Sequence, residues 1–294
     1  MEVHTSIETM QRQARELRQT GEVLGFVPTM GYLHEGHLSL LDTARPKCDT
    51  LIMSVFVNPT QFGENEDFDE YPRDPERDAQ LAEEHGVDIL FHPGAEEMYP
   101  ENYRTYLSVE QLSGKLCGRS RPNHFRGVTT IVAKLFNITQ PDVAVFGQKD
   151  AQQAVIIQQM VRDLHFPVDI IVAPIIREED GLAMSSRNTY LTAAERKQAL
   201  TLFQGLQRAK KIVESGRANS NIIVEEIRAL FHEQPDVEED YISVVDLENL
   251  EPLETINRTA LIAVAAHVGT TRLIDNIIII KDGTHTLKIE DTSR

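Results

Sequence analysis

Short apolar runs alternate with segments of helical periodicity along the first part of the chain. The runs are rich in branched residues and bounded by turn-forming residues, which predicts buried strands at 23–27, 50–57, 87–91, 143–146 and 168–172. Between them, apolar residues recur with the spacing of one helix face, which predicts helices near 6–20, 34–44, 75–85, 128–138 and 151–162. Strands that alternate with helices form parallel sheets, and ligands bind outside the carboxyl ends of such strands.

The pattern changes after Tyr190, where two helices come first and three strands follow. We expect the helices near 193–215 and 222–232 and the strands near 241–245, 260–264 and 271–279. Grouped helices followed by grouped strands are typical of an α+β domain. The fold class is therefore α/β, with a parallel-sheet N-terminal domain over 1–177 and a smaller α+β C-terminal domain over 178–294.

Three further local features are predicted. Residues 103–109 have the composition of an additional strand, and Asp282-Gly283 is typical of a hairpin turn. The charged segment Arg177–Gly181 is a candidate hinge between the two domains.

The composition is that of an ordinary globular protein. The chain has 294 residues, 41% of them hydrophobic, and 46 Asp and Glu against 29 Lys and Arg give a formal charge of −17. Nonspecific nucleic-acid or membrane binding needs a net basic surface, so this balance argues against both, although a local basic cleft can still bind an anionic small molecule. Cys48 and Cys117 are too few for a disulfide scaffold. Because the sequence has neither a leader pattern nor a membrane-spanning stretch, we expect a cytoplasmic protein.

The turn after the first of these apolar runs carries two histidines. Residues 28–31 turn the chain, and His34 and His37 stand where the next helix begins. The start of a helix presents free backbone N–H groups and the positive end of the helix dipole, which favours a phosphate, and imidazoles add further donors. The spacing differs from the zinc pattern H-E-x-x-H, but a metal pair remains possible, as does a role in capping or packing.

Later segments repeat the combination of a turn with polar or cationic side chains. Gly147–Asp150 follows a strand and contains a lysine, and its glycine allows a ligand to approach the backbone. Residues 118–127 form a basic loop in an acidic chain, for which a solvated turn is the alternative. Ser185, Ser186 and Arg187 bring two hydroxyls and a guanidinium together. These groups can bind the oxygens of a triphosphate, or the serines can cap a helix.

Four motifs stand in one order along the chain. They are PTMG…HEGH from Pro28 to His37, NPTQF from Asn58 to Phe62, FGQKD from Phe146 to Asp150, and MSSR from Met184 to Arg187. With RPNHFRG and SRNxYL, this set resembles the pantothenate synthetase family of ATP-dependent pantoate–β-alanine ligases, from near the N-terminus to about Asn276. The resemblance implies a Rossmann-like N-terminal domain of the nucleotidylyltransferase superfamily, in which a histidine pair and a KMSKS-like loop hold ATP.

The resemblance also implies a two-step reaction. The pantoate carboxylate attacks the α-phosphorus of ATP, which releases pyrophosphate and forms pantoyl adenylate; the amine of β-alanine then attacks the acyl carbon and releases AMP. Mg²⁺ is expected on the phosphates of ATP, and no metal site built from protein side chains alone is expected. The implied partners are small-molecule substrates and a second copy of the chain, in a homodimer formed through the N-terminal domain, with no nucleic acid and no membrane.

The residues that match the family motifs supply the expected site. The expected catalytic residues are His34, His37, Lys149 and Arg187. ATP is expected to contact Met30, Gly31, His34, His37, Gly147, Gln148, Lys149, Asp150, Ile176, Met184, Ser185, Ser186 and Arg187. Pantoate is expected to contact amides, which bind hydroxyls and carboxylates without competing as nucleophiles, at Asn58, Gln61 and Gln153. His37 is the preferred proton donor, while Asp150 holds either Mg²⁺ or the ribose.

The sequence departs from the family in two places. Gln148 stands where the family more usually has glutamate, and altered fine tuning without loss of activity is expected. The tail beyond Asn276 runs longer than the family pattern, and it carries no assigned role.

Two other functions compete with the ligase. A nucleotidylyltransferase that stops at a nucleotide ester shares the histidine motif, but the amides of Gln61 and Gln153 favour a hydroxy-acid pocket. A catalytically silent protein on the same fold is expected to lose some of His37, Lys149 and Arg187, and all three are present.

Overall fold

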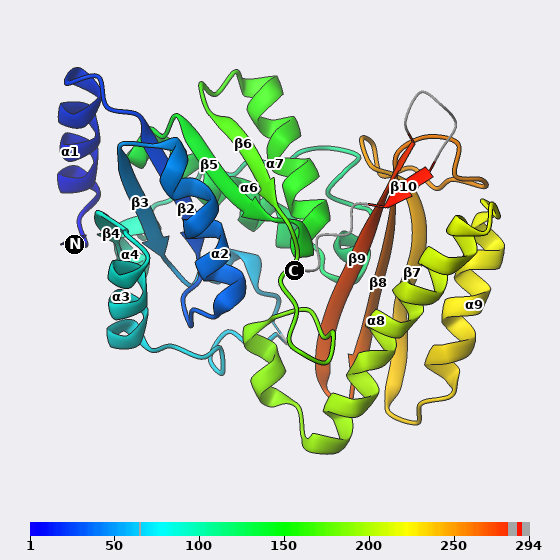
Figure 1. Cartoon of the computed structure of the whole chain (residues 1–294). Helices are drawn as coiled ribbons and strands as arrows, with labels where there is room; N and C mark the ends of the chain where they lie inside the picture. Colours follow the sequence, from blue (N-terminus) through cyan, green and yellow to red (C-terminus); the bar gives the residue numbers. More distant parts are fainter. Residues whose placement is uncertain (65, 282–286, 290–294) are drawn as a thin grey trace. The chain divides into compact units, whose positions relative to one another are not determined.

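Six parallel strands form the sheet of the N-terminal part of the chain (Figure 1). The computed structural model describes residues 1–64, 66–281 and 287–289. It divides into two compact units, of which the N-terminal unit comprises Met1–Gly114, Arg121–Gly147 and Ile156–Ala173. The C-terminal unit comprises Lys115–Ser120, Gln148–Val155 and Pro174–Arg294. The segment Gln148–Asp150 therefore belongs to the C-terminal unit, although it directly follows a strand of the N-terminal one.

The N-terminal sheet has the strand order β1-β4-β3-β2-β5-β6. Its strands are β1 (Glu2–His4), β2 (Leu24–Thr29), β3 (Thr50–Val55), β4 (Ile89–Phe91), β5 (Val143–Gly147) and β6 (Asp169–Ala173). From β2 the chain passes outward to β3 and β4, and it then returns to β5 on the other side of β2. The strand order thus reverses between β2 and β5, and ligands bind at such a switch point in open parallel sheets.

Helices flank this sheet and complete its core. They are α1 (Ile7–Gln19), α2 (Glu35–Ala44), α3 (Pro75–Glu84), α4 (Ala95–Met98), α6 (His124–Thr139) and α7 (Ala151–Leu164). Helix α1 packs against α6, while α2 packs against α3 and over β2 and β5. All six residues of β3 are buried, as expected for a parallel strand covered on both faces. The predicted parallel sheet is confirmed.

The C-terminal unit contains an antiparallel sheet in the order β10-β9-β8-β7. Its elements are the short helix α5 (Cys117–Ser120), the helices α8 (Ala193–Glu214) and α9 (Ser220–His232), and the strands β7 (Val237–Asp246), β8 (Ala260–Val268), β9 (Thr271–Lys281) and β10 (Leu287–Ile289). Helix α8 begins at a capping box in which Thr192 and Glu195 each bind the other's backbone N–H. The predicted α+β arrangement of helices followed by strands is confirmed.

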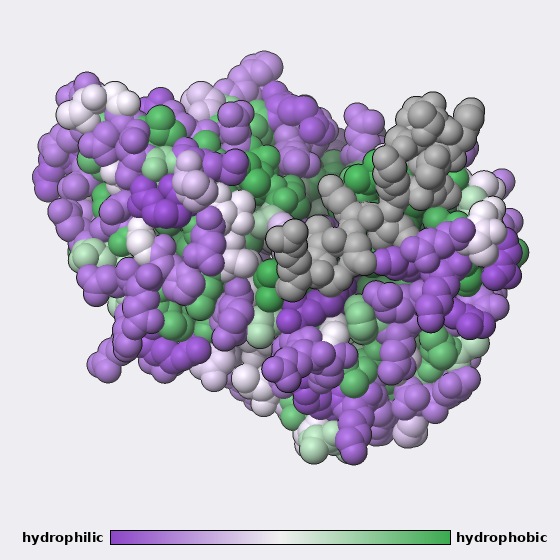
Figure 2. All heavy atoms as spheres, in the orientation of Figure 1, coloured by the Kyte–Doolittle hydropathy of each residue, from purple (hydrophilic) through white to green (hydrophobic). Residues whose placement is uncertain are grey.

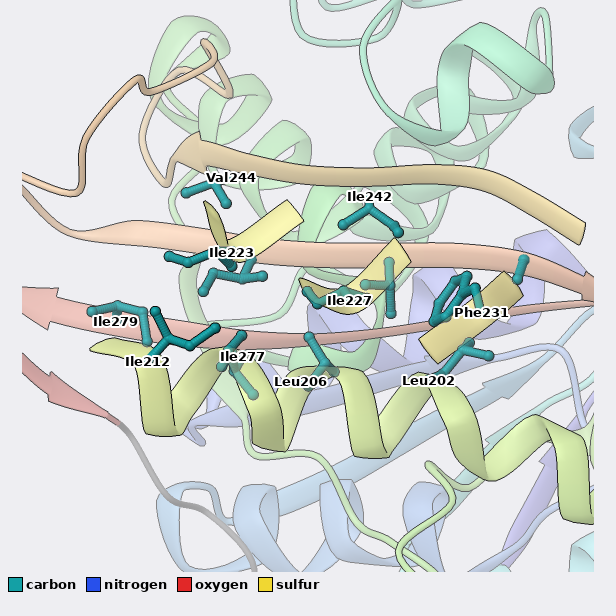
Figure 3. Close-up of a cluster of buried hydrophobic side chains, with 14 of the residues drawn as sticks. Leu202, Leu206, Ile212, Ile223, Ile227, Phe231, Ile242, Val244, Ile277 and Ile279 are labelled. Carbon is teal, nitrogen blue, oxygen red and sulfur yellow. The ribbon is translucent and has the colours of Figure 1, made fainter. Parts of the chain in front are cut away.

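One face of this sheet packs against the two helices (Figure 3). Leu202, Leu206 and Ile212 project from α8, and Ile223, Ile227 and Phe231 project from α9. They meet Ile242 and Val244 of β7 and Ile277 and Ile279 of β9. Strand β9 packs against this helix-covered core and pairs with β8, so polar side chains on β9 occupy fixed positions.

Two local predictions differ from the structure, and one short strand was not predicted. Residues 103–109 form no strand, because the threonine hydroxyls of α6 bind the backbone of this segment: Leu107 N–H donates to Thr130 Oγ1, and Thr129 Oγ1 donates to the Leu107 carbonyl. The short strand β1 is an element that the apolar pattern does not reveal, since its residues are largely exposed. Strand β2 continues through Pro28 to Thr29. The predicted turn at Asp282-Gly283 lies outside the described residues, although β9 and β10 pair in an antiparallel manner on either side of it.

Hydrophilic residues cover most of the face seen in Figure 2, and hydrophobic ones are scattered among them. Within the described ranges, none of the helices combines the length and the apolar character needed to cross a membrane.

Candidate functional site

The two histidines lie together at the start of α2. His34 occupies the N-cap position with an extended backbone (φ −139°, ψ 173°), and His37 is in the first turn, with its N–H donating to the His34 carbonyl at 2.7 Å. The two imidazole rings are stacked, with their centroids 4.0 Å apart and an angle of 25° between their planes. The side chain of His34 makes no capping hydrogen bond to the helix. The predicted pair is therefore assembled at a helix N-terminus, where an anion is favoured.

A buried carboxylate holds the loop that leads to these histidines. Asp78 of α3 is 2% exposed, and its two oxygens accept hydrogen bonds from the N–H groups of Tyr32 and Leu33, both at 2.7 Å. The neighbouring Arg77 donates to the Leu33 carbonyl at 2.8 Å. Gly31 has a φ of +83°, and a Cβ added there would lie 2.8 Å from Asp78 Oδ2, so only glycine fits. Asp78 was not predicted, because an acid within the charged segment PERDAQLAEE is indistinguishable from a solvated one.

The amide residues after β3 form a second cluster. Asn58 is buried; its oxygen accepts from the N–H and hydroxyl of Thr60, and its nitrogen donates to Gln61 Oε1 at 3.1 Å and to the Gly127 carbonyl at 3.2 Å. Gln61 Nε2 lies 3.2 Å from the sulfur of Met30. The structure thus joins Gln61, expected to bind pantoate, to Met30, expected to frame the nucleotide.

The basic loop contributes a half-buried ion pair to the same region. Arg121 Nε donates to Glu66 Oε1 at 2.8 Å, and His124 Nδ1 lies 2.7 Å from the carbonyl oxygen of Gln61. Because a carbonyl only accepts, Nδ1 carries the proton, and His124 Nε2 accepts from Arg121 Nη1 at 3.2 Å. Burial raises the pKa of Glu66, but the Arg121 guanidinium outweighs it and holds that pKa below its ordinary value. The loop is therefore partly a structural clamp around Gln61, so the solvated-turn interpretation fails at Arg121.

Gly147 ends β5 beside the strand that leads to the histidines. Strands β2 and β5 pair at Gly25 with Val143 and at Phe26 with Ala144. Among the described atoms, only Leu40 Cδ2, at 3.9 Å, would contact a Cβ added at Gly147. Packing of the protein itself does not demand glycine here, which leaves room for a ligand next to the backbone.

In the C-terminal unit, the turn of Gln148–Asp150 is held by β9. Asn276 donates its amide hydrogens to the carbonyls of Gln148 and Lys149, each at 3.0 Å, and Gln148 Nε2 donates to Asn276 Oδ1 at 3.3 Å. The ammonium of Lys149 lies 3.9 Å from the carboxylate of Asp150, which is exposed. Gln153 is half-buried in the first turn of α7. Asn276 was not predicted as a site residue, since a single asparagine inside an apolar strand gives no local signal.

The predicted serine–arginine cluster lies at the start of a 3₁₀ turn, Ser186–Tyr190. Ser185 caps this turn, its Oγ accepting from the Arg187 N–H at 3.3 Å, and Ser186 is buried. The capping interpretation of Ser185 is therefore confirmed. Met184 N–H donates to the Ile176 carbonyl at 3.0 Å, so the two segments expected to frame adenine run side by side.

No group of three or more histidine, cysteine, aspartate or glutamate side chains suited to a metal ion occurs in the part of the chain that the structure describes. The histidine pair thus lacks a third such ligand within those residues. A magnesium ion bound mainly by phosphates, with one protein carboxylate, remains compatible with this donor set.

Comparison with known proteins identifies one family. A family model described as pantoate-beta-alanine ligase matches residues 2–278. A pantothenate synthetase from Thermotoga petrophila is 53% identical over 279 residues, which cover 95% of this chain and 100% of that protein.

Two solved structures extend the comparison. The crystal structure of pantothenate synthetase from Thermus thermophilus has a TM-score of 0.89 at 43% identity, and covers 94% of this chain and 98% of that one. The pantoate-beta-alanine ligase of Francisella tularensis, complexed with beta-gamma ATP and beta-alanine, has a TM-score of 0.77 at 33% identity over 94% of this chain and 97% of that one.

Proposed function

The chain belongs to the pantoate–β-alanine ligase family, and from this premise we propose how its residues share the work of the reaction. The protein is an enzyme that uses ATP to join pantoate to β-alanine, forming pantothenate, a precursor of coenzyme A. The reaction proceeds through pantoyl adenylate and releases pyrophosphate and AMP. The observation that most supports the residue assignment is the stacked pair His34 and His37 at the N-terminus of α2, which follows the central strand β2.

The first step transfers an adenylyl group to pantoate. A carboxylate oxygen of pantoate forms a bond to the α-phosphorus, and the bond to the bridging oxygen breaks, so pyrophosphate leaves with the electron pair. Negative charge spreads over the phosphate oxygens in the transition state, and positioned donors stabilise it. His34 and His37 supply these donors in the N-terminal unit, and His37 is the proposed proton donor.

The C-terminal unit carries the remaining phosphate contacts in this proposal. Lys149 supplies a point charge and Arg187 a forked donor, while Ser185 and Ser186 add neutral donors through hydroxyl and amide groups. The backbone at Gln148 contributes to the same turn. The half-buried position of Lys149, whose side chain is 23% exposed, leaves its ammonium accessible to an anion.

Adenine and ribose are proposed to lie against small and apolar groups. Met30 and Gly31 belong to the turn after β2, and Gly147 is the last residue of β5, with room for a ligand beside its backbone. Ile176 and Met184 are held side by side by their backbone hydrogen bond.

Pantoate is proposed to bind the amides of Gln61 and Gln153, with Asn58 fixing Gln61. The hydrogen bond from Asn58 Nδ2 to Gln61 Oε1 orients the Gln61 amide. Its nitrogen carries two hydrogens; one faces the Met30 sulfur, and the other can donate to a hydroxyl or a carboxylate. In the second step the amine of β-alanine attacks the acyl carbon of the adenylate. The carbon–oxygen bond to AMP then breaks, and the amine loses its proton as the amide forms.

Magnesium is proposed to accompany ATP. Asp150 is exposed and carries the carboxylate of the lysine turn, so it is suited to share such an ion with phosphates or to bind the ribose. When bound, Mg²⁺ would neutralise part of the charge of the pyrophosphate leaving group.

The family resemblance further supports a homodimer formed through the N-terminal unit and a cytoplasmic location. Gel filtration with light scattering measures the oligomeric state directly. A monomer across the working concentration range would contradict the dimer.

A product assay tests the function itself. Protein, ATP, Mg²⁺, pantoate and β-alanine are mixed, and AMP and pantothenate are quantified with each component omitted in turn. We expect equal amounts of both products in the complete mixture and neither amide nor net AMP when any substrate is missing. A stable nucleotide ester without amide would instead indicate a nucleotidylyltransferase.

A further inference from the structure

Two adjacent residues of β9, Asp275 and Asn276, hold two separate segments of the proposed ATP site. Both are buried in the C-terminal unit, at 3% and 2% exposure, and neither belongs to a motif discussed above. We propose that Asp275 and Asn276 are positioning residues that fix the Lys149 turn and the segment entering Ser185–Arg187 relative to each other. This inference rests on the proposed function, because it concerns the placement of groups assigned to ATP.

Asn276 grips the lysine turn through three hydrogen bonds. The carbonyls of Gln148 and Lys149 only accept, so the atom that faces both of them must be the amide nitrogen of Asn276, at 3.0 Å from each. Its oxygen then faces Gln148 Nε2, which donates at 3.3 Å. Both hydrogens and the oxygen of one buried amide are thus used on two consecutive residues. Aspartate has no hydrogens for the two carbonyls, so the contact requires an amide at this position.

Asp275 grips the other segment through Arg177. Arg177 Nη1 and Nη2 donate to the two carboxylate oxygens at 2.7 and 3.0 Å, a forked contact between a half-buried guanidinium and a fully buried carboxylate. Arg177 also donates to the Gly181 carbonyl at 3.1 Å, and its backbone forms a β-bridge with Ala183. The candidate hinge Arg177–Gly181 is therefore a tight turn fastened to β9.

The Asp275–Arg177 contact and the Asn276 contacts to the lysine turn are linked, because Asp275 and Asn276 are adjacent in β9. Asp275 Oδ1 accepts from the backbone N–H of Asn276 at 2.8 Å, so the carboxylate orients the residue whose amide holds Lys149. Strand β9 pairs with β8 along its length, and Asp275 and Asn276 lie opposite Val264 and Ala263. A rigid strand thereby sets the spacing between the lysine turn and the chain that enters Ser185.

This spacing matters because charge stabilisation depends on position. A displacement of about 1 Å between a catalytic group and its target can reduce a rate about 10²-fold. Lys149 is on a short turn, and the Asn276 amide donates to the backbone carbonyl of Lys149 and to that of the preceding residue, Gln148. We therefore expect loss of that amide to act through Lys149.

A double-mutant cycle tests the first grip. Asn276→Ala and Lys149→Ala are made singly and together, and the ATP dependence of pantoate-stimulated pyrophosphate exchange is measured for each. We expect Asn276→Ala to lower kcat/KM for ATP about 10²-fold when Lys149 is present, and less than about threefold in the Lys149→Ala background. Equal factors in both backgrounds would overturn the proposal, since they would show an effect independent of Lys149.

A matched control separates positioning from general loosening of the unit. Asp246 is a buried carboxylate at the end of β7 that accepts backbone N–H groups from Glu248 and Asn249. Asp246→Asn is expected to lower the melting temperature while leaving kcat/KM for ATP within about threefold of wild type. A loss comparable with that of Asn276→Ala would overturn the positioning role.

The second grip is tested without removing a buried charge. Arg177→Lys keeps a cation near Asp275 but cannot donate to both oxygens in a fork. Arg177→Lys and Arg187→Ala are made singly and together. The factor by which Arg177→Lys lowers kcat/KM for ATP is expected to be at least fivefold smaller in the Arg187→Ala background than in wild type, and an unchanged factor would overturn this half of the proposal. Pantoate-stimulated pyrophosphate exchange by the wild-type protein is measured first and tests the proposed function by itself. Failure of the proposed function is therefore distinguishable from failure of the positioning role of Asp275 and Asn276.

Discussion

Asp78→Asn tests whether the buried carboxylate of α3 sets the position of the histidine pair. The carboxylate uses one oxygen for the Tyr32 N–H and the other for the Leu33 N–H. An amide keeps one acceptor and turns a second donor toward the other N–H group. The substitution therefore removes one charged hydrogen bond and creates one contact between two donors.

The expected size follows from that loss. A hydrogen bond to a charged group contributes about 1.5–3 kcal/mol, so about 2 kcal/mol of the preference for the present loop conformation disappears. The backbone of this loop is strained at Tyr32, whose φ of 51° lies in the left-handed region that only glycine adopts freely. A change of about 2 kcal/mol corresponds to roughly a 30-fold change in rate when the loop must adopt this conformation for catalysis.

The assay is pantoate-dependent pyrophosphate exchange with ATP and pantoate varied separately. We expect kcat/KM for ATP to fall about 30-fold while KM for pantoate stays within about twofold, because the Asn58–Gln61 cluster is untouched. Asp74→Asn is the control: Asp74 is the N-cap of the same helix, and asparagine caps equally well, so little change is expected. Wild-type kinetics in Asp78→Asn would refute the reasoning.

Three further substitutions extend the account. His37→Ala is expected to lower turnover about 10²- to 10³-fold, as for other transition-state donors, and stopped-time AMP formation measures it. Gly127→Ala would place a Cβ in van der Waals conflict with the backbone of the turn that carries Gln61, so KM for pantoate should rise at least tenfold, whereas Gly94→Ala, with open space, should leave it unchanged. Burial raises the pKa of Glu66 but Arg121 holds it below 4.5, so the pair stabilises the fold above that pH and loses its contribution as the pH falls through the lowered pKa. Glu66→Gln should therefore flatten the acid limb of a plot of melting temperature against pH.

The fold class follows from the sequence because its signals are long and repeated. Strands β2 to β5 are apolar and largely buried, and the later helices carry clear periodicity, so the two sheets follow from pattern except for the short strand β1. The segment at 103–109 has the same composition as a strand but pairs with the threonine hydroxyls of α6 instead. The strand propensity of the segment gives no information about this tertiary contact with α6.

The motif residues of the candidate site were visible in the sequence, whereas the residues that hold them were not. Asp78 and Asn276 bind backbone groups of segments distant in the chain, and such a role leaves no periodic or spacing signal around either residue. Glu66 is a similar case, since its partner Arg121 stands in a loop that resembles a solvated turn. Backbone partners become visible only when the fold brings the segments together.

The most direct test of the central claim follows the carboxylate oxygen of pantoate. Pantoate labelled with ¹⁸O in its carboxylate is converted with ATP, Mg²⁺ and β-alanine, and the AMP is analysed by mass spectrometry. If the carboxylate attacks the α-phosphorus, one labelled oxygen appears in each AMP formed and the amide carbonyl keeps the other. Unlabelled AMP, or label in inorganic phosphate together with ADP, would contradict the account.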